Sequence, residues 1–359
     1  MFSFIERRYK QWTRGSSWKT NSKGFLHSRS SAARGSTTSF VERHYKQWSR
    51  GLDDKFKTEG HAPHDACTRL IRDEFIDIAF HPKFKLAEDA SYFAIGSCFA
   101  RNIEAALLKE GYPVLSTQLE LPPEAEARIF HFQSEVMTKF NPHSMEVEIE
   151  RAFSDTPIGY GLIEMNEGKL WNPQLHRVGE LSVEGQLETT KAVRKTVRKI
   201  SEADVVFITL GLTETWWDVE TNTPLNDAPA DWRFAKRTGR FEFRNTGFAE
   251  SYTSVERLLN LIRANSTRDP KIILTVSPVP LLRTFTDQDI IVANSYSKST
   301  LRAVATEIAG AYADVDYFPS FEMVTYSPRH LAWRHDQRHV EPPMVWSITR
   351  RFRESYIEG

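Results

Sequence analysis

The sequence predicts a three-layer α/β/α fold, in which helices cover both faces of a doubly wound parallel sheet. Three apolar segments, 92–95, 204–210 and 271–278, lack polar alternation, as is typical of strands buried on both faces. Segments with apolar residues at spacings of three and four lie between them, so that strands and helices alternate along the chain. Sheets of this kind bind ligands beyond the carboxyl ends of their strands.

Length and composition fit an ordinary globular protein. The chain has 359 residues, 40% hydrophobic and 26% charged, enough for one large domain and an appendage. No apolar run reaches the roughly 18 residues of a membrane span, and the start of the chain lacks the apolar segment of a signal peptide. The two cysteines, Cys67 and Cys98, form no disulfide framework and match no zinc spacing. We therefore expect a cytoplasmic protein without a metal site.

The first 60 residues are expected to form a basic, partly flexible arm ahead of a domain over 61–359. The arm carries 13 Lys or Arg and five Asp or Glu, so its net charge of +8 is balanced by −8 in the rest of a neutral chain. Within it, the segment 3–15 returns as 39–51 with ten of thirteen residues identical. The linker between the copies is rich in Ser, Thr, Gly and Arg.

The duplicated motif allows more than one interpretation. One copy could pack on the domain while the other is spare, or the two could be tethered docking motifs for a multimeric protein partner. Basic residues interleaved with Tyr and Trp also suit nucleic-acid binding. The acidic domain and the regular repeat argue against a nucleic-acid partner.

The domain begins with an approach segment over 61–91 and the strand 92–95. This strand leads into a helix whose apolar residues repeat every three or four positions up to Gly111. The next expected elements are a short strand near 114–115, a helix within 124–132, a turn at 140–143 and a basic surface helix over 190–200.

The regular pattern resumes at the buried strand 204–210, after which a loop-rich insertion is expected up to about residue 252. Ser254 is then expected to cap a helix with an apolar stripe. The remaining expected elements are the strand 271–278, a helix over 293–312, a strand over 315–318 and a final helix over 343–357.

The candidate nucleophiles lie where the first strand turns into its helix. Gly96 permits a sharp turn, and Ser97 and Cys98 follow it at the helix N-terminus. Unpaired N–H groups and the helix dipole favour negative charge there. We therefore expect a lowered pKa for the Cys98 thiol and donors for an oxyanion. The structural alternative is a small cysteine packed at a tight turn.

A candidate base lies near the other end of the chain, just before the final helix. In the segment 336–339, Asp336 stands three residues before His339. Within one tight turn, the carboxylate can bond the ring nitrogen that faces away from the nucleophile, which fixes the tautomer and stabilises the imidazolium. The same spacing also occurs by chance in unrelated surface pairs.

Several motifs together resemble the GSCFA family. The motif Gly-Ser-Cys-Phe-Ala at 96–100 gives that family its name. Further blocks of the resemblance are 209–217, 274–281, 292–302, 315–322 and 336–339. The ordered blocks cover roughly 75–355 and leave out the repeated arm.

GSCFA proteins are similar to the SGNH or GDSL-type esterases and acetyltransferases, which implies a flavodoxin-like sheet. In that superfamily a Gly-Asp-Ser-Leu corner carries the nucleophile and a late D-x-x-H carries the base. Here Cys98 takes the place of the serine and Ser97 that of the aspartate. The resemblance leaves three alternatives: a thiol acyl-transfer catalyst, a Ser97 that acts from a shifted corner, and a loss of catalysis.

The oxyanion donors of the superfamily also differ here. Its G-x-N-D block corresponds to the segment from Gly211 to Glu214, where Thr213 replaces the asparagine. A hydroxyl can donate a hydrogen bond, but it is held less rigidly than an amide. Asn141 could supply the missing amide or could bond its own turn.

Other residues beyond the strand ends are expected to be structural. Glu214 and Glu322 should bond loop backbone, and Lys298 and Arg302 should lie on a solvated helix face. The two tryptophans at 216–217 could stack on a sugar or pack in the core.

Two classes of function follow. The first is an acyl esterase or O-acyltransferase acting on an acetyl or similar group, with a carbohydrate ester as substrate. In such an enzyme, Cys98 or Ser97 attacks the acyl carbonyl, and His339 takes and returns the proton of this nucleophile. Asp336 orients the imidazole ring of His339. A hydrolase of this type needs no cofactor, whereas a transferase would use an acyl donor such as acetyl-CoA. The alternative is a non-catalytic scaffold that binds a glycan or a partner and is tethered by the basic arm.

Overall fold

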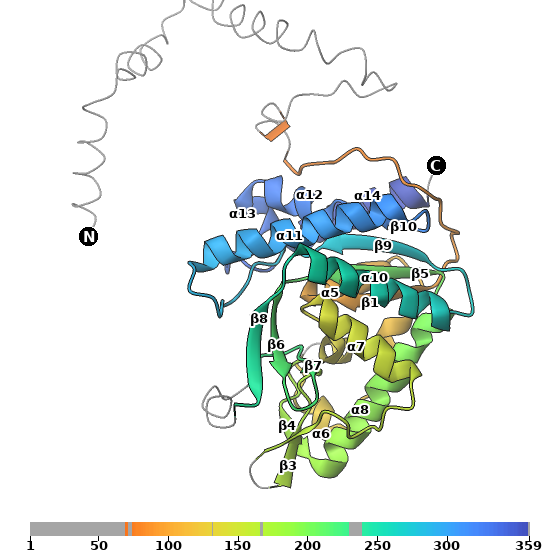
Figure 1. Ribbon diagram of the computed structural model, residues 1–359. Coiled ribbons are helices and arrows are strands. Elements are labelled where there is room, and N and C mark those ends of the chain that lie inside the picture. Colours follow the sequence, from red (N-terminus) through yellow and green to blue (C-terminus); the bar gives the residue numbers. More distant parts are fainter. Residues whose placement is uncertain (1–68, 71–73, 131, 166–167, 230–238, 358–359) are drawn as a thin grey trace, which may run out of the picture. The chain divides into compact units, whose positions relative to one another are not determined.

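The computed structural model describes residues 69–70, 74–130, 132–165, 168–229 and 239–357 (Figure 1). The chain from residue 69 onward forms one compact unit. The basic arm with its duplicated motif lies outside the described residues. In the described part of the chain, no helix combines the length and the apolar content needed to cross a bilayer.

Four parallel strands form the central sheet, in the order β1-β5-β9-β10. Their bounds are β1 (Tyr92–Gly96), β5 (Val205–Leu210), β9 (Lys271–Val276) and β10 (Val315–Tyr317). Each neighbouring pair is parallel. The carboxyl ends of all four strands therefore lie at one edge, where the sequence places its candidate site.

The strand expected near 114–115 is reduced to a single parallel bridge between Val114 and Tyr92. Leu115 already begins the 3-10 turn η1 (Leu115–Thr117), which ends the extended backbone after one residue. Counted in chain order, with Val114 as the second position, the sheet has the order 2-1-3-4-5. This is the flavodoxin-like order that the resemblance implies.

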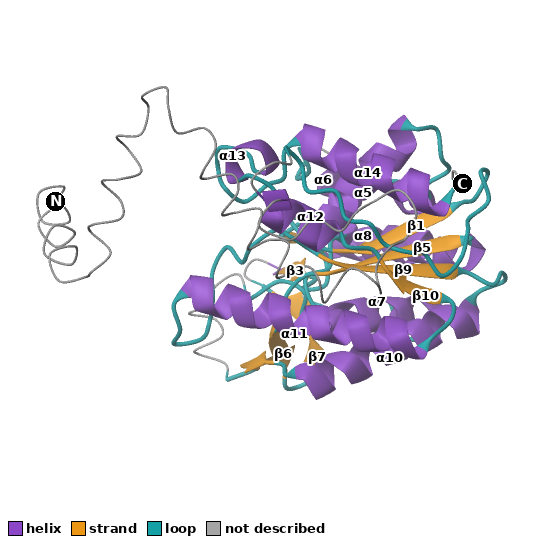
Figure 2. Ribbon diagram, turned by 90° about the horizontal axis from the view of Figure 1, so that it is seen from above, coloured by secondary structure: helices purple, strands orange, loops and turns teal. Residues whose placement is uncertain are grey.

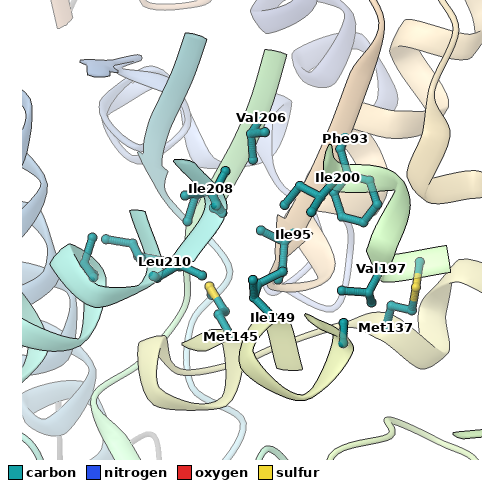
Figure 3. Close-up of a cluster of buried hydrophobic side chains, with 14 of the residues drawn as sticks. Phe93, Ile95, Met137, Met145, Ile149, Val197, Ile200, Val206, Ile208 and Leu210 are labelled. Carbon is teal, nitrogen blue, oxygen red and sulfur yellow. The ribbon is translucent and has the colours of Figure 1, made fainter. Parts of the chain in front are cut away.

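One face of the sheet is covered by four helices. Phe93 and Ile95 of β1 and Ile208 of β5 point to this face and belong to one buried cluster. Figure 3 shows Ile95 beside Ile149 of α7 and Phe93 beside Ile200. The covering helices are α7 (Pro142–Phe153), α8 (Val183–Arg198), α10 (Phe248–Asn265) and α11 (Ile290–Ala311).

The other face is covered as well. Tyr92 and Ala94, which alternate with Phe93 and Ile95 along β1, join a second buried cluster with Phe207. The helices on this side are α5 (Cys98–Lys109), α12 (Ser320–Tyr326), α13 (Arg329–Ala332) and α14 (Pro342–Tyr356). Figure 2 shows α5, α12 and α14 on one side of the strands and α10 and α11 on the other. The predicted three-layer, doubly wound architecture is confirmed.

Several helix boundaries differ from the prediction because other residues make the caps. The expected turn at 140–143 is the start of α7, whose N-cap Asn141 accepts a hydrogen bond from the backbone of Ser144 at 2.8 Å. The helix expected to start at 190 begins at Val183 behind the cap Ser182. The helix expected at 293 begins at Ile290 behind the cap Asp289. Of the described residues within 124–132, only those of the short α6 (Pro123–Glu126) are helical.

The start of α10 was also predicted wrongly. The helix begins at Phe248, because Glu250 accepts a hydrogen bond from the backbone N–H of the N-cap Gly247 at 3.2 Å. Ser254 therefore lies inside the helix, where its hydroxyl donates to a carboxylate oxygen of Glu146 at 2.7 Å. A hydroxyl in a helix interior can resemble a cap in sequence when the true cap is a glycine.

Two small antiparallel sheets lie in segments for which no strand was predicted. The first has the order β2-β3-β4, with β2 (Ile163–Glu164), β3 (Lys169–Trp171) and β4 (Glu180–Ser182). The second lies in the predicted loop-rich insertion and has the order β7-β6-β8, with β6 (Glu214–Asp218), β7 (Thr223–Pro224) and β8 (Phe241–Asn245). β6 starts four residues after β5 ends, so this sheet grows from the carboxyl edge of the central sheet.

Candidate active site

The corner after β1 is built as the sequence predicts. Gly96 has a positive φ of 133°, and a Cβ at this position would overlap the carbonyl oxygen of Thr209 in the adjacent β5. The backbone N–H of Ser97 donates to that same carbonyl at 3.1 Å. The close pairing of β1 with β5 thus requires glycine here, and it directs the chain straight into α5.

Ser97 is the N-cap of α5. Its hydroxyl accepts a hydrogen bond from the backbone of Phe99 at 3.2 Å and lies 3.2 Å from the hydroxyl of Thr209. The residue is only 3% exposed. Both contacts hold the hydroxyl within the scaffold of the corner.

Cys98 is the first residue of α5 and the only cysteine among the described residues. Burial raises the pKa of its thiol above the ordinary value. The nearby charges of Arg338, Lys298 and Arg177, together with the backbone N–H of Cys98, offset only part of this increase. The expectation of a lowered thiol pKa is therefore wrong, because desolvation outweighs the helix N-terminus and the cations. An attacking Cys98 would need a base to remove its proton.

A buried ion pair fixes the start of α5 against the sheet. The guanidinium of Arg101 donates to the carbonyl oxygens of Ala94 in β1 and Ser134 in η2 (Gln133–Met137), each at 2.9 Å. It also lies 3.0 Å from a carboxylate oxygen of Glu104, which accepts from the Ser116 hydroxyl at 2.5 Å. Burial raises the pKa of Glu104 and lowers that of Arg101. This network sets the position of the turn that carries Cys98.

Asp336 and His339 form the predicted pair within one turn. The carboxylate of Asp336 lies 2.5 Å from Nδ1 of His339 and accepts from the backbone N–H groups of Arg338 and His339, each at 3.0 Å. The bond to the imidazole, followed by the two backbone bonds, holds the pKa of Asp336 well below its usual range. Gln337 adopts a positive φ of 56°, which closes the turn.

The turn 336–339 lies in the loop between α13 and α14. A bridge between Trp333 and Val340 closes the loop ahead of α14, and the charge of Arg338 acts on the Cys98 thiol. The His339 side chain is 41% exposed. Among the described residues, no hydrogen bond joins His339 to Ser97 or Cys98. Catalytic hydrogen bonds of this kind are often long in a protein without substrate.

The carboxyl ends of β1 and β5 are joined by the segment 138–140. The backbone N–H of Lys139 donates to the carbonyl of Gly96 at 2.7 Å, and that of Leu212 donates to the carbonyl of Phe140 at 2.8 Å. A Cβ at Gly211 would overlap the Phe140 carbonyl. Gly96 and Gly211, both predicted site residues, therefore lie against the same segment.

The side chains predicted as oxyanion donors are engaged elsewhere. The hydroxyl of Thr213 donates to Asn245 at 2.7 Å, and its backbone N–H donates to the hydroxyl of Ser297 at 2.9 Å. The amide of Asn141 donates to the carbonyl of Leu225 at 3.0 Å, while its oxygen caps α7. The Thr213 hydroxyl hydrogen and one N–H of the Asn141 amide are therefore already used within the protein.

Glu214 holds a loop, as predicted. Its carboxylate accepts from the Thr284 hydroxyl at 2.5 Å and from the backbone of Phe285 at 2.8 Å. Glu322 differs from the prediction, because its partners are side chains. It accepts from Arg302 at 2.5 Å and from the Tyr317 hydroxyl at 2.8 Å.

Lys298 is buried, which contradicts the predicted solvated face. Only 4% of its surface is exposed, and its Nζ donates to the carbonyl of Gly211 at 2.5 Å. A signal for this was present in the sequence. Lys298 precedes Leu301 by three residues and Ala305 by seven, so it continues the apolar stripe of α11 toward the carboxyl edge of the sheet.

An aromatic group lines the second antiparallel sheet. The ring of Trp216 lies 5.6 Å from that of Phe243 and 5.2 Å from that of Phe285, between ring centres. The Arg244 guanidinium lies 4.6 Å from the ring centre of Trp217. Both indole N–H groups are buried and have no hydrogen-bond partner among the residues that the structure describes. Among the described residues, no three His, Cys, Asp or Glu side chains are grouped so as to hold a metal ion.

Comparison with known proteins gives a family and two similar structures. The chain is similar to a carbohydrate esterase family 3 protein from Talaromyces cellulolyticus, with 13% identity and a TM-score of 0.31, over 73% of this chain and 94% of that one. It is also similar to a mutant acetyl-xylooligosaccharide esterase from Geobacillus stearmophilus, with 14% identity and a TM-score of 0.30, over 76% and 96%. No curated protein matches. The model of the GSCFA family matches residues 91–352, from the residue before β1 into α14, and the chain therefore belongs to the GSCFA family.

Proposed function

We propose that this GSCFA protein is an acyl esterase or O-acyltransferase that uses Cys98 as nucleophile and His339 as base, with Asp336 orienting the ring. One observation carries the proposal. The Asp336–His339 pair is preassembled by a 2.5 Å contact, in the turn whose Arg338 acts on the Cys98 thiol. These groups come from opposite ends of the domain, and we infer that they act together at the edge where parallel sheets bind ligands.

The chemistry is a two-step acyl transfer. Nε2 of His339 takes the Cys98 proton while Sγ forms a bond to the acyl carbon, whose carbonyl oxygen becomes an oxyanion. When the carbonyl reforms, the C–O bond to the alcohol breaks, and the departing oxygen takes the proton from the imidazolium. Water or an acceptor hydroxyl then gives its proton to His339 and attacks the acyl carbon; the C–S bond breaks, and Sγ takes the proton back from the imidazolium. A thiol with a raised pKa fits this scheme, because the base removes the proton during attack.

The contacts of the corner favour Cys98 over Ser97 as the nucleophile. The Ser97 hydroxyl accepts from the backbone of Phe99 and contacts Thr209. An attack by this oxygen would remove the cap of α5. The Cys98 thiol has no such structural bond among the described residues.

The substrate class we propose is an acyl ester of a carbohydrate, with an acetyl or similar group. The aromatic residues of β6 and β8 support it, since the half-buried ring of Trp216, beside Phe243, is of the kind that stacks on the flat face of a sugar. Transfer, as opposed to hydrolysis, would add an acyl donor such as acetyl-CoA. A cytoplasmic location remains a prediction from the cysteine content.

The turnover of 4-nitrophenyl acetate by His339→Ala tests the proposal. We expect kcat to fall by about 10²- to 10⁴-fold, the usual contribution of a positioned acid–base group. The matched control is His335→Ala, which removes an exposed imidazole four residues earlier and should keep the wild-type rate. Equal rates for wild type and His339→Ala would exclude the His339 role. A wild type without turnover would contradict the esterase and favour the scaffold alternative.

A further inference from the structure

Lys298 is a buried cation that the mechanism above does not use. Its side chain enters the protein from α11 and bonds the carbonyl of Gly211, just past the carboxyl end of β5. The preceding residue, Ser297, accepts from the backbone N–H of Thr213. These two contacts hold the loop after β5, in which the superfamily places oxyanion donors, against the side of α11.

No carboxylate pairs with Lys298 among the described residues. The charged groups that act on it are Cys98, from the start of α5, and Arg338, from the turn before α14. Burial lowers the pKa of Lys298 to about 7, Cys98 raises it in part, and Arg338 lowers it further. Lys298 is bonded just past the end of β5, and Cys98 follows the end of the adjacent strand β1.

Lys139 provides a contrast within the same protein. It is also fully buried, but its Nζ lies 2.5 Å from a carboxylate oxygen of Glu148 and 2.5 Å from the Gln174 carbonyl. This is the usual way to bury a lysine, because an unpaired buried charge is costly. Lys298 lacks such a carboxylate. Buried charges without an ionic partner are typical of functional sites, where the charge is needed for binding or catalysis.

We propose that the ammonium group of Lys298 donates a hydrogen bond to the oxyanion that forms when an acyl group is attacked by Cys98, in place of the superfamily's asparagine. This inference rests on the proposed acyl-transfer function. The bond to Gly211 uses one of the three N–H groups of the ammonium and leaves two available. Thr213 and Asn141, the donors expected from sequence, are bonded to Asn245 and Leu225.

The contacts of Lys298 favour a donor to the oxyanion over a base for the thiol. Among the described residues, no hydrogen bond joins Nζ of Lys298 to Sγ of Cys98. His339 has no such bond either in this part of the chain, so the absence does not separate the two residues. What differs is that the His339 ring has the Asp336 carboxylate to stabilise its protonated form, whereas Lys298 has no carboxylate partner among the described residues. A donor to the oxyanion must leave space for the acyl oxygen between itself and the nucleophile.

The test compares Lys298→Met with Arg302→Met, using 4-nitrophenyl acetate. Both substitutions remove one cation from α11, but Arg302 is paired with Glu322 and stands one turn further along the helix. We expect Lys298→Met to lower kcat by about 10²-fold or more, with little change in KM, because the oxyanion exists only in the transition state and the intermediate. Arg302→Met should keep the wild-type kcat.

A second variant covers a failure of Lys298→Met to fold. Lys298→Gln keeps a donor for the Gly211 carbonyl while it removes the charge, and we expect its kcat to fall by at least about tenfold. A folded Lys298 variant with wild-type kcat, alongside an inactive Cys98→Ala, would overturn the Lys298 role and leave the proposed function standing. A wild type and Cys98→Ala with equal turnover would instead overturn the proposed function.

Stability supplies a readout that does not depend on turnover. The folded protein binds fewer protons at Lys298 than the unfolded chain between pH of about 7 and about 10.4. Lys298 therefore makes the wild-type free energy of unfolding rise with pH in this window. The Lys298→Gln variant should lose this part of the slope, and Arg302→Met should keep it. An unchanged slope in Lys298→Gln would contradict a buried, unpaired ammonium.

Discussion

Replacing Cys98 with alanine is expected to abolish turnover of 4-nitrophenyl acetate, with a loss in kcat of at least about 10⁴-fold. Without the sulfur there is no covalent acyl intermediate, and His339 has no nucleophile to activate. The loss of the side chain should leave the fold intact, since Cys98 is half-buried and makes no side-chain hydrogen bond among the described residues. Turnover and the unfolding transition are therefore measured on the same preparation.

Ser97→Ala is the matched control for this result. It removes the hydroxyl that caps α5 and should cost about 1 kcal/mol of unfolding free energy. It leaves the sulfur in place, so most of the turnover should remain. If Cys98→Ala is active and Ser97→Ala is folded but inactive, Ser97 is the nucleophile and Cys98 is not.

Of the substitutions proposed for this protein, Arg101→Met is expected to lower the free energy of unfolding most, by about 3–5 kcal/mol. The carboxylate of Glu104 would then be buried without its cation, and the carbonyls of Ala94 and Ser134 would lose their donors. A methionine side chain fills much of the space, so the cost comes from unpaired polar groups. Denaturant unfolding followed by circular dichroism measures the effect.

The control for Arg101 is Lys191→Met, which breaks an exposed ion pair with Glu188 on α8. Pairs of this kind contribute about 0–1 kcal/mol. An Arg101→Met variant no less stable than Lys191→Met would show that the Arg101–Glu104 pair does not hold the start of α5.

The long apolar strands could be predicted from sequence because their residues are buried on both faces. Val205–Leu210 and Lys271–Val276 lie in the middle of the sheet, and their side chains are apolar at nearly every position. The strands β6 and β8 were missed, since they are short, antiparallel and mix aromatic with charged residues. The start of α10 was missed because a glycine caps it.

The backbone turns of the candidate site could be predicted from the sequence, whereas the pKa of its thiol could not. Gly96 has a turn that a residue with a Cβ cannot adopt, which a strand-to-helix corner in the sequence already indicates. The bond between Asp336 and His339 follows from their spacing within one turn. The raised pKa of Cys98 depends on burial by side chains from distant segments, which local sequence does not encode, whereas the burial of Lys298 follows the apolar stripe of α11.

The central claim is that Cys98 and the imidazole of His339 serve the same acyl group. It is tested most directly by mixing the protein with 4-nitrophenyl acetate, quenching with acid and locating the acetyl group by peptide mass spectrometry. We predict acetylation of Cys98 in the wild type and much slower formation of the same adduct in His339→Ala. An acetyl group on another residue, or adducts that form equally fast in both proteins, would contradict the claim.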